Sequence, residues 1–193
     1  YDLPRRGLDL HVDGGPSPFD DDNVLVRVGV QAEVIDDRDR PTAALTFVVD
    51  TSGSMDRDDR LGLVREALSA LVGELADDDT VAIVTYGDDS AILLEPTAAA
   101  DEHEILAAID DLRPGGSTNL EAGLETAYAL AERAFVEGGV NRLVLASDGV
   151  ANVGTVDPDE LTRRISDRAI NGIQLVTVGF GMGNYNDETM EQL

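Results

Sequence analysis

Five oxygen-bearing side chains in three short segments form a set that could hold a divalent cation. Two are carboxylates and three are hydroxyls: Asp50, Ser52, Ser54, Thr118 and Asp148. Such hard oxygen ligands suit Mg²⁺, Mn²⁺ or Ca²⁺. Because only two of the five are carboxylates, the set leaves room for water, which favours Mg²⁺ over Ca²⁺.

Asp50 is the member of this set for which burial is most costly. It follows a continuous apolar run over residues 43–49, which is typical of a strand buried on both faces of a parallel sheet. A buried carboxylate is unfavourable unless it is paired. The chain contains no lysine, and no arginine lies near Asp50 in the sequence. A bound cation would satisfy this carboxylate.

The elements that position these residues alternate between strands and helices. Apolar runs predict strands over residues 43–49, 81–86, 91–94, 143–146 and 173–180, and helical spacing predicts helices over 60–75, 105–112, 119–136 and 159–170. The strands at 81–86 and 91–94 should form a hairpin. This order predicts an α/β fold with a doubly wound, mostly parallel sheet and helices on both faces. Ligands of such sheets bind at the carboxyl ends of the strands, where Asp50 and Asp148 lie.

The two ends of the chain give weaker signals. Residues 1–23 are polar and rich in Pro, Gly and Asp, and we interpret them as an irregular lead-in. Residues 24–34 alternate in polarity, which predicts a half-buried strand at an antiparallel edge. Residues 186–193 look like the start of a helix. We therefore expect a lead-in with an edge strand over 1–40 and one domain over 41–193.

The five candidate ligands resemble the metal-ion-dependent adhesion site of von Willebrand factor type A (VWA) domains. The pattern Asp50-x-Ser52-x-Ser54, then Thr118, then Asp148-Gly149 is similar in residue type, order and approximate spacing. The resemblance spans roughly residues 43–180, and stretches such as 114–118 and 179–185 look like a bacterial subgroup. Members of this kind extend by a further strand and helix, so the resemblance implies that residue 193 is not the end of the fold.

The resemblance implies a role for each of the five residues. Ser52, Ser54 and Thr118 would coordinate Mg²⁺, or Mn²⁺ or Ca²⁺, directly. Asp50 and Asp148 would act directly or through water. The open coordination position would take an Asp or Glu from a protein partner. The family's strand order would place the strand at 43–49 beside the strand at 143–146. This implies a non-enzymatic binding module, part of a longer chain in an extracytoplasmic setting.

Composition narrows the choice of partners. The chain has 193 residues and a formal net charge of −25, from 39 acidic residues against 14 arginines. So acidic a surface repels nucleic-acid phosphates and anionic membranes. No apolar run reaches the ~18 residues that a membrane-spanning helix needs. The absence of cysteine excludes disulfides and thiolate metal sites. The acidic excess fits either adaptation to high salt or a genome that favours arginine over lysine.

Several other interpretations of the same residues stay open. Thr118 and Glu121 fit a capping box at a helix start, which alone would explain Thr118. The acidic runs, including residues 77–79, could bind calcium, but they lack the EF-hand pattern and are more typical of solvated surface. Metal-assisted hydrolysis at the same site is one alternative function. A structural scaffold with an empty site is the other.

Overall fold

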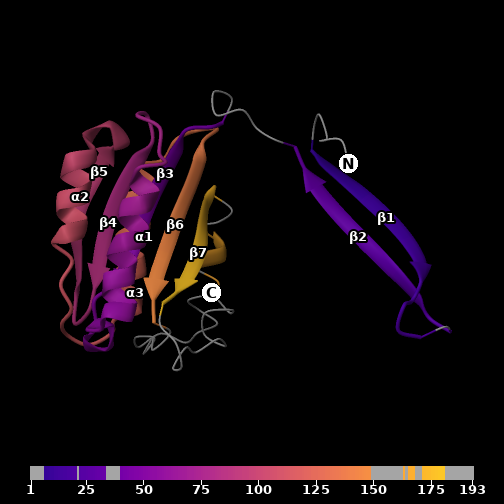
Figure 1. Cartoon of the computed structure of the whole chain (residues 1–193). Helices are drawn as coiled ribbons and strands as arrows, with labels where there is room; N and C mark the ends of the chain where they lie inside the picture. Colours follow the sequence, from indigo (N-terminus) through magenta and orange to yellow (C-terminus); the bar gives the residue numbers. More distant parts are fainter. Residues whose placement is uncertain are drawn as a thin grey trace. The chain divides into compact units, whose positions relative to one another are not determined.

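The computed structural model describes residues 7–20, 22–33, 40–148, 163, 165–167 and 171–180 (Figure 1). By its internal contacts the chain splits into two compact units, Tyr1–Arg40 and Pro41–Leu193. The second unit contains all five candidate metal ligands. No helix in the described ranges is both long and apolar enough to cross a membrane.

The second unit is built on a five-stranded sheet of order β5-β4-β3-β6-β7. All neighbouring strands are parallel except β4 and β5, which form the expected hairpin at one edge. The strands are β3 (Ala43–Asp50), β4 (Thr80–Tyr86), β5 (Ser90–Ala98), β6 (Val140–Ser147) and β7 (Ile173–Gly179). The predicted fold class is confirmed, and so is the pairing of β3 with β6. Because β4 and β6 flank β3 on opposite sides, the strand order reverses at β3.

Helices cover both faces of this sheet (Figure 1). Side chains of α1 (Leu63–Val72) and α2 (Glu102–Asp110) share one buried cluster with the sheet, and those of α3 (Leu120–Arg133) share the other. Both clusters are mainly aliphatic, as expected from the low aromatic content of 4%. Burial of these two layers fixes the strand ends that carry the site.

The helix predicted over residues 60–75 begins differently from expectation. A short 3-10 turn, η1 (Gly53–Met55), is followed by a π-helical segment, η2 (Asp58–Gly62), which leads into α1. The π-helical segment places Arg60 in the interior, with 4% of its surface exposed. Such π turns occur often at functional sites.

The first unit differs from the sequence prediction in two ways. Residues Leu8–Pro16, expected to be irregular, form strand β1, which pairs antiparallel with β2 (Val24–Ala32). The predicted edge strand is therefore not part of the large sheet, because β2 pairs only with β1 among the described residues. Its apolar residues were expected to be half buried, but Val24, Val26, Val28 and Val30 are 60–70% exposed. Alternation in the sequence indicates a strand with two unlike faces but not what covers them.

One further expectation about the second unit is wrong, and others lie outside the described residues. Asp79, interpreted as solvated surface, is fully buried, and its carboxylate accepts hydrogen bonds from the backbone N–H groups of Ala43 and Ala76 at 2.8 and 2.9 Å. It thereby fixes the start of β3. Of the helix predicted over 159–170, residues 163 and 165–167 are described, and these are helical. The helix start predicted at 186–193 lies outside the described residues.

Candidate metal centre

The candidate site lies where β3, β4 and β6 end at the same edge of the sheet. The strand register places Asp50 opposite Tyr86 on β4, and Ser147 follows the pair formed by Val49 and Ala146 on β6. Because side chains alternate along a strand, Asp50, Tyr86 and Ser147 all face the α3 side of the sheet. The three side chains meet there.

The Asp50 carboxylate accepts three hydrogen bonds. One oxygen accepts the backbone N–H of Ser52 at 2.8 Å, and the other accepts the Ser147 hydroxyl at 3.0 Å and the Tyr86 hydroxyl at 3.3 Å. Asp50 is fully buried. Burial raises the pKa of Asp50 above its ordinary value, the bonds from Ser52 and Ser147 lower it, and the charge of Asp148 raises it further. Among the described residues no arginine forms an ion pair with this carboxylate.

The hydroxyls of Ser52 and Ser54 converge beside Asp50. Their Oγ atoms lie 3.0 Å apart, which requires η1 to turn the chain back within two residues. Ser52 is 3% exposed and Ser54 is half-buried. These two oxygens and the Asp50 carboxylate therefore lie in one short loop at the end of β3.

The loop that carries Thr118 is joined to the β3 loop by backbone hydrogen bonds. The Gly115 N–H donates to the Thr51 carbonyl at 2.6 Å, and the Gly53 N–H donates to the Gly116 carbonyl at 3.0 Å. Gly116 has a φ of +87°, a conformation that a residue with a Cβ adopts only at a cost. This turn places the 115–118 segment against the Ser52–Ser54 loop.

Thr118 does not cap α3. The cap is Asn119, whose side-chain oxygen accepts the Ala122 N–H at 3.2 Å. The capping-box interpretation of Thr118 and Glu121 is therefore wrong. Within the described ranges no side chain hydrogen-bonds the half-buried Thr118 hydroxyl, which leaves its oxygen available to a ligand.

Asp148 is paired with an arginine that sequence reasoning did not identify. Arg60, from the π-helical segment, donates from Nη1 to Asp148 Oδ2 and to the Ser54 carbonyl, the latter at 2.9 Å. The side chains of Arg60 and Asp148 are only 5% and 1% exposed. Arg60 therefore connects Asp148 to the Ser52–Ser54 loop, and the three predicted segments form one cluster.

Sequence reasoning missed three residues of this cluster: Arg60, Tyr86 and Ser147. Tyr86 and Ser147 are the last residues of β4 and β6, so their positions at strand ends were a usable signal. Burial raises the pKa of the Tyr86 phenol well above its ordinary value, so it acts as a neutral hydrogen-bond donor. Arg60 gave no such signal, because it lies 88 positions from Asp148.

The residues present fit a small hard cation. Asp50 is a buried carboxylate without a cationic partner among the described residues, and three hydroxyl-bearing residues lie in the two loops beside it. Within the described ranges no three or more Asp, Glu, His or Cys side chains come together as a metal-binding group. A cation held here would thus have two carboxylates at most from the described residues, with hydroxyls and water as its other ligands.

Comparison with known proteins identifies the domain family. The family model of the von Willebrand factor type A domain matches residues 44–193, which includes all five candidate ligands. The chain belongs to the VWA domain family. Domains of this family are typically metal-dependent adhesion or protein-interaction modules.

Relatives and solved structures agree with this assignment. The chain is 42% identical over 178 residues to the uncharacterized protein YfbK of Escherichia coli (strain K12), a match that covers 92% of this chain and 31% of YfbK. It thus spans less than a third of that curated relative. A von Willebrand factor type A structure from Catenulispora acidiphila superposes with a TM-score of 0.67 at 16% identity, over 97% of this chain and 43% of that one. The manganese-loaded Plasmodium vivax TRAP protein superposes with a TM-score of 0.64 at 22% identity, over 78% and 61%.

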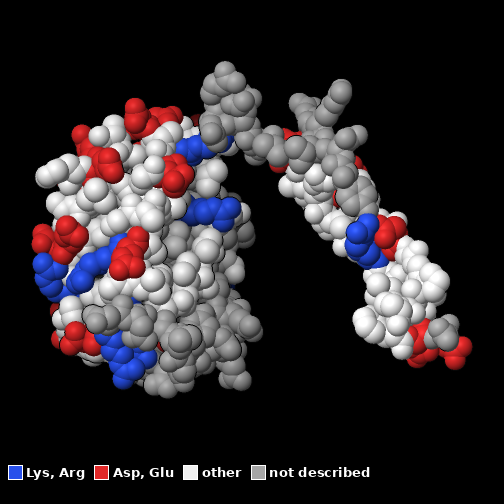
Figure 2. Space-filling model, viewed as in Figure 1, with Lys and Arg blue, Asp and Glu red and all other residues white. Residues whose placement is uncertain are grey.

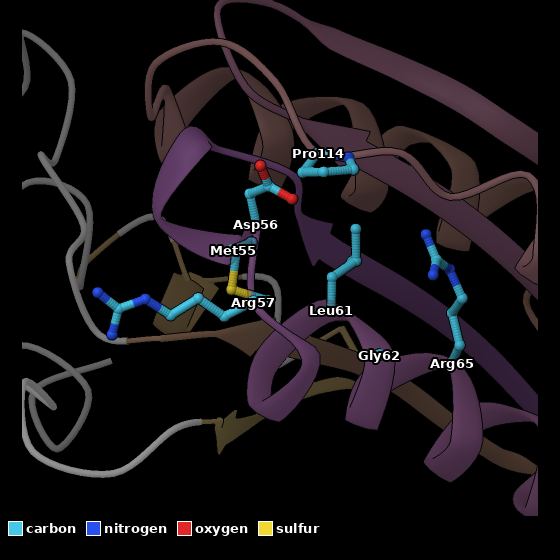
Figure 3. Close-up of a pocket in the computed structure, with 7 residues that line it drawn as sticks. All are labelled: Met55, Asp56, Arg57, Leu61, Gly62, Arg65 and Pro114. Carbon is cyan, nitrogen blue, oxygen red and sulfur yellow. The ribbon is translucent and has the colours of Figure 1, made fainter.

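A surface pocket of ≈ 280 Å³ opens beside the Ser52–Ser54 loop of this VWA domain (Figure 3). Its apolar lining includes Met55 and Leu61, both buried in the core. Figure 3 shows the side chains of Arg57 and Arg65 extending to opposite sides of it. The Arg65 guanidinium donates to the Leu112 carbonyl, whereas Arg57 is exposed. The full lining is Met55, Asp56, Arg57, Leu61, Gly62, Arg65 and Pro114.

Proposed function

We propose that this VWA domain binds a protein partner through a divalent cation, Mg²⁺ in the first place, with Mn²⁺ or Ca²⁺ as alternatives. Ser52, Ser54 and Thr118 coordinate the cation directly, and Asp50 and Asp148 do so directly or through water. The observation that carries this proposal is the buried Asp50 carboxylate, which has no cationic partner among the described residues and lies beside two hydroxyls 3.0 Å apart. The manganese-loaded TRAP structure, with the same fold, supports a divalent cation.

The open coordination position takes an Asp or Glu side chain from the partner. Two carboxylates, one of them paired with Arg60, neutralise a divalent cation only in part, so the bound cation attracts a further anionic ligand. Exposed Arg57, which lines the adjacent pocket, favours an acidic partner residue. Because the domain carries a net charge of −25, a basic rim on the partner should strengthen association at low salt.

A site with so few carboxylates binds its cation weakly, with a dissociation constant on the order of 10⁻⁴–10⁻³ M, like extracellular calcium modules. For Ca²⁺, a site of this affinity fills only where the free cation is abundant, so weak binding favours an extracytoplasmic setting for Ca²⁺ and not for Mg²⁺.

The test is isothermal titration of the chelator-treated chain with Mg²⁺, Mn²⁺ and Ca²⁺. We expect one binding event, lost in Asp50→Ala and weakened at least about tenfold in Thr118→Ala, since each removes an oxygen ligand. Matched controls are Asp110→Ala, an exposed acid on α2, and Thr126→Ala, whose hydroxyl bonds Ser90. Neither control should change the affinity. No heat with any of the three cations would contradict the metal site and favour a scaffold with an empty site.

The open position is tested separately with the Mn²⁺-loaded domain. Water bound to Mn²⁺ enhances the relaxation of bulk water protons, and added acetate should reduce that enhancement by replacing the water. Acetamide, a neutral molecule of similar shape, should have no effect. Equal effects of the two molecules would show that the cation does not select a carboxylate.

A further inference from the structure

The two-stranded ribbon of the first unit, β1 and β2, has two unlike faces. Residues directly opposite each other in the register, such as Val12 and Val28, lie on the same face. One face carries apolar or small residues only: Leu8, Leu10, Val12, Gly14, Pro16, Val24, Val26, Val28, Val30 and Ala32. The other carries all the charged side chains of the two strands, Asp9, Asp13 and Arg27, together with His11, Gly15, Leu25, Gly29 and Gln31.

The apolar face is exposed along its whole length. The seven Leu and Val side chains on it are 60–74% exposed. In Figure 2 much of the visible surface of the ribbon is white, with an adjacent blue and red pair along it and red groups towards its two ends. A contiguous apolar surface of this kind marks an interaction site, because leaving it in water forfeits the main driving force of folding.

The ribbon also leaves hydrogen-bonding groups unused. Among the described residues β1 and β2 pair only with each other, so each strand has one outer edge without a neighbouring strand. A lone two-stranded hairpin is marginally stable at best in water. An open edge is a template for a further strand, and an apolar sheet face packs best against another sheet. The ribbon therefore has the features of two strands taken from a larger β-structure.

The comparisons indicate where the missing part of that structure comes from. The match to YfbK leaves 15 of the 193 residues outside it (193 − 178), so at least 25 of residues 1–40 lie within it. YfbK is about three times as long as the matched region, since the match covers 31% of it. The Catenulispora acidiphila structure aligns with 97% of this chain, which includes most of the ribbon, and that chain is also longer. The segment that forms the ribbon thus has counterparts in chains that are much longer than this one.

We propose that the apolar face of the β1–β2 ribbon packs against β-structured sequence of the same polypeptide that lies outside residues 1–193. The ribbon then supplies two strands of a second domain that adjoins the VWA domain. A second copy of this chain is a less suitable partner for the apolar face, because stacking two ribbons face to face would bring together two molecules that each carry a charge of −25. An anionic membrane is disfavoured for the same reason.

Hydrogen exchange measured by mass spectrometry tests this proposal on the natural polypeptide that contains residues 1–193, compared with residues 1–193 alone. We expect amides of residues 8–16 and 24–32 to exchange on the order of 100-fold more slowly in the longer chain. Residues 1–193 alone should be monomeric by light scattering and should bind the apolar dye ANS.

A substitution on each face provides the matched comparison. Val28→Glu, on the apolar face, should abolish the protection in the longer chain, whereas Gln31→Glu, on the opposite face, should leave it unchanged. Mg²⁺ binding by the Val28→Glu chain shows that the VWA domain is still folded, and it reports on the metal site separately from the ribbon.

Three outcomes would overturn the proposal. The first is equal exchange of the ribbon in the long and short chains. The second is a concentration-dependent dimer of residues 1–193 in which the ribbon is protected from exchange. That result would mean that a second copy of the chain covers the apolar face. The third is a natural polypeptide without sequence beyond these 193 residues.

Discussion

At Asp50 the free energy of folding and the capacity to hold a cation depend on the same carboxylate. Its pKa in the metal-free folded chain is raised above the ordinary value of 3.8, chiefly because burial disfavours the charged form. The folded chain therefore binds this proton more tightly than the unfolded chain does. Between pH 3.8 and the raised pKa, the contribution of Asp50 to stability falls as pH rises, and above the raised pKa it stays unfavourable.

We therefore expect Asp50→Asn to stabilise the metal-free domain at pH 7 while it abolishes cation binding. The gain should shrink as pH falls through the raised pKa and vanish below pH 3.8, where the native carboxyl is also neutral. Urea unfolding in the presence of a chelator at pH 7 and pH 4.5 measures it. A loss of stability at pH 7 would show that the hydrogen bonds from Ser52, Ser147 and Tyr86 outweigh the cost of burying the charge.

Arg60 forms a buried ion pair with Asp148, the second carboxylate of the candidate site. Removal of one partner of a buried ion pair typically costs about 3–5 kcal/mol, because the other charge stays buried and unpaired. Arg60→Met should cost that much in the metal-free domain, and Mg²⁺ should restore part of it by supplying positive charge beside Asp148. Urea unfolding with and without Mg²⁺ measures both effects.

A double-mutant cycle separates the ion pair from the packing of the Arg60 side chain. Asp148→Asn combined with Arg60→Met should cost less than the sum of the two single substitutions, since the second change removes the charge that the first leaves unpaired. If the two losses simply add, Arg60 stabilises the loop through its bond to the Ser54 carbonyl instead.

The residues of the site were predictable only in part. All five predicted residues lie at or next to the ends of strands or helices: Asp50, Ser52, Ser54, Thr118 and Asp148. The carboxyl ends of parallel strands meet at one edge of a sheet, so the proximity of the two carboxylates follows from the topology. The contact of Arg60 with Asp148 does not follow from it. It depends on a π-helical turn, and the apolar pattern over residues 60–75 predicts only a helix.

On the scale of elements, α3 comes close to the sheet at Gly123. A Cβ built on Gly123 would lie 2.9 Å from both Cβ and Cγ of Tyr86, closer than such atoms come in proteins. Tyr86 in turn donates its hydroxyl to Asp50. The distance between α3 and β4 is thus linked to the position of a carboxylate in the candidate site.

Gly123→Ala should therefore destabilise the domain by about 1–3 kcal/mol, the usual cost of overpacking a core, even though alanine favours a helix. Gly62→Ala is the matched control, because no atom lies within 4 Å of its added Cβ and its φ of −58° suits alanine. It should be neutral or stabilising by up to about 1 kcal/mol. Equal stability of the two variants would show that α3 moves away from the sheet without cost.

The elements themselves were predicted unevenly for physical reasons. The buried strands β3 and β6 and the amphipathic helix α3 give strong periodic signals, and the structure contains each of them. Strand β1 was missed although Leu8, Leu10 and Val12 alternate with polar residues, because the Gly14-Gly15-Pro16 sequence that follows is typical of a turn. Its pairing with β2 depends on contacts across the register, which a single segment of sequence does not contain.

At the scale of the whole molecule, charge is the dominant feature. Acidic side chains are spread over the visible face of the second unit in Figure 2, with arginines among them. With 39 acidic residues and 14 arginines, most carboxylates have no cationic partner available, so the folded state repels itself. The Debye length falls from about 10 Å at 0.1 M salt to about 3 Å at 1 M, which removes most interactions between exposed charges.

The unfolding midpoint of the chelator-treated chain should therefore rise between about 0.1 and 1 M KCl. Each kcal/mol gained would raise it by about 2–4 °C for a domain of this size. KBr at equal ionic strength is the control. KCl and KBr screen charges alike, and neither is strongly excluded from the protein surface as sulfate is, so an equal rise in both salts reports screening. A rise in KCl and KBr together would favour adaptation to salt over the genomic explanation of the missing lysines. A falling midpoint would mean that attraction between the 14 arginines and their nearby carboxylates exceeds the repulsion among the acidic residues.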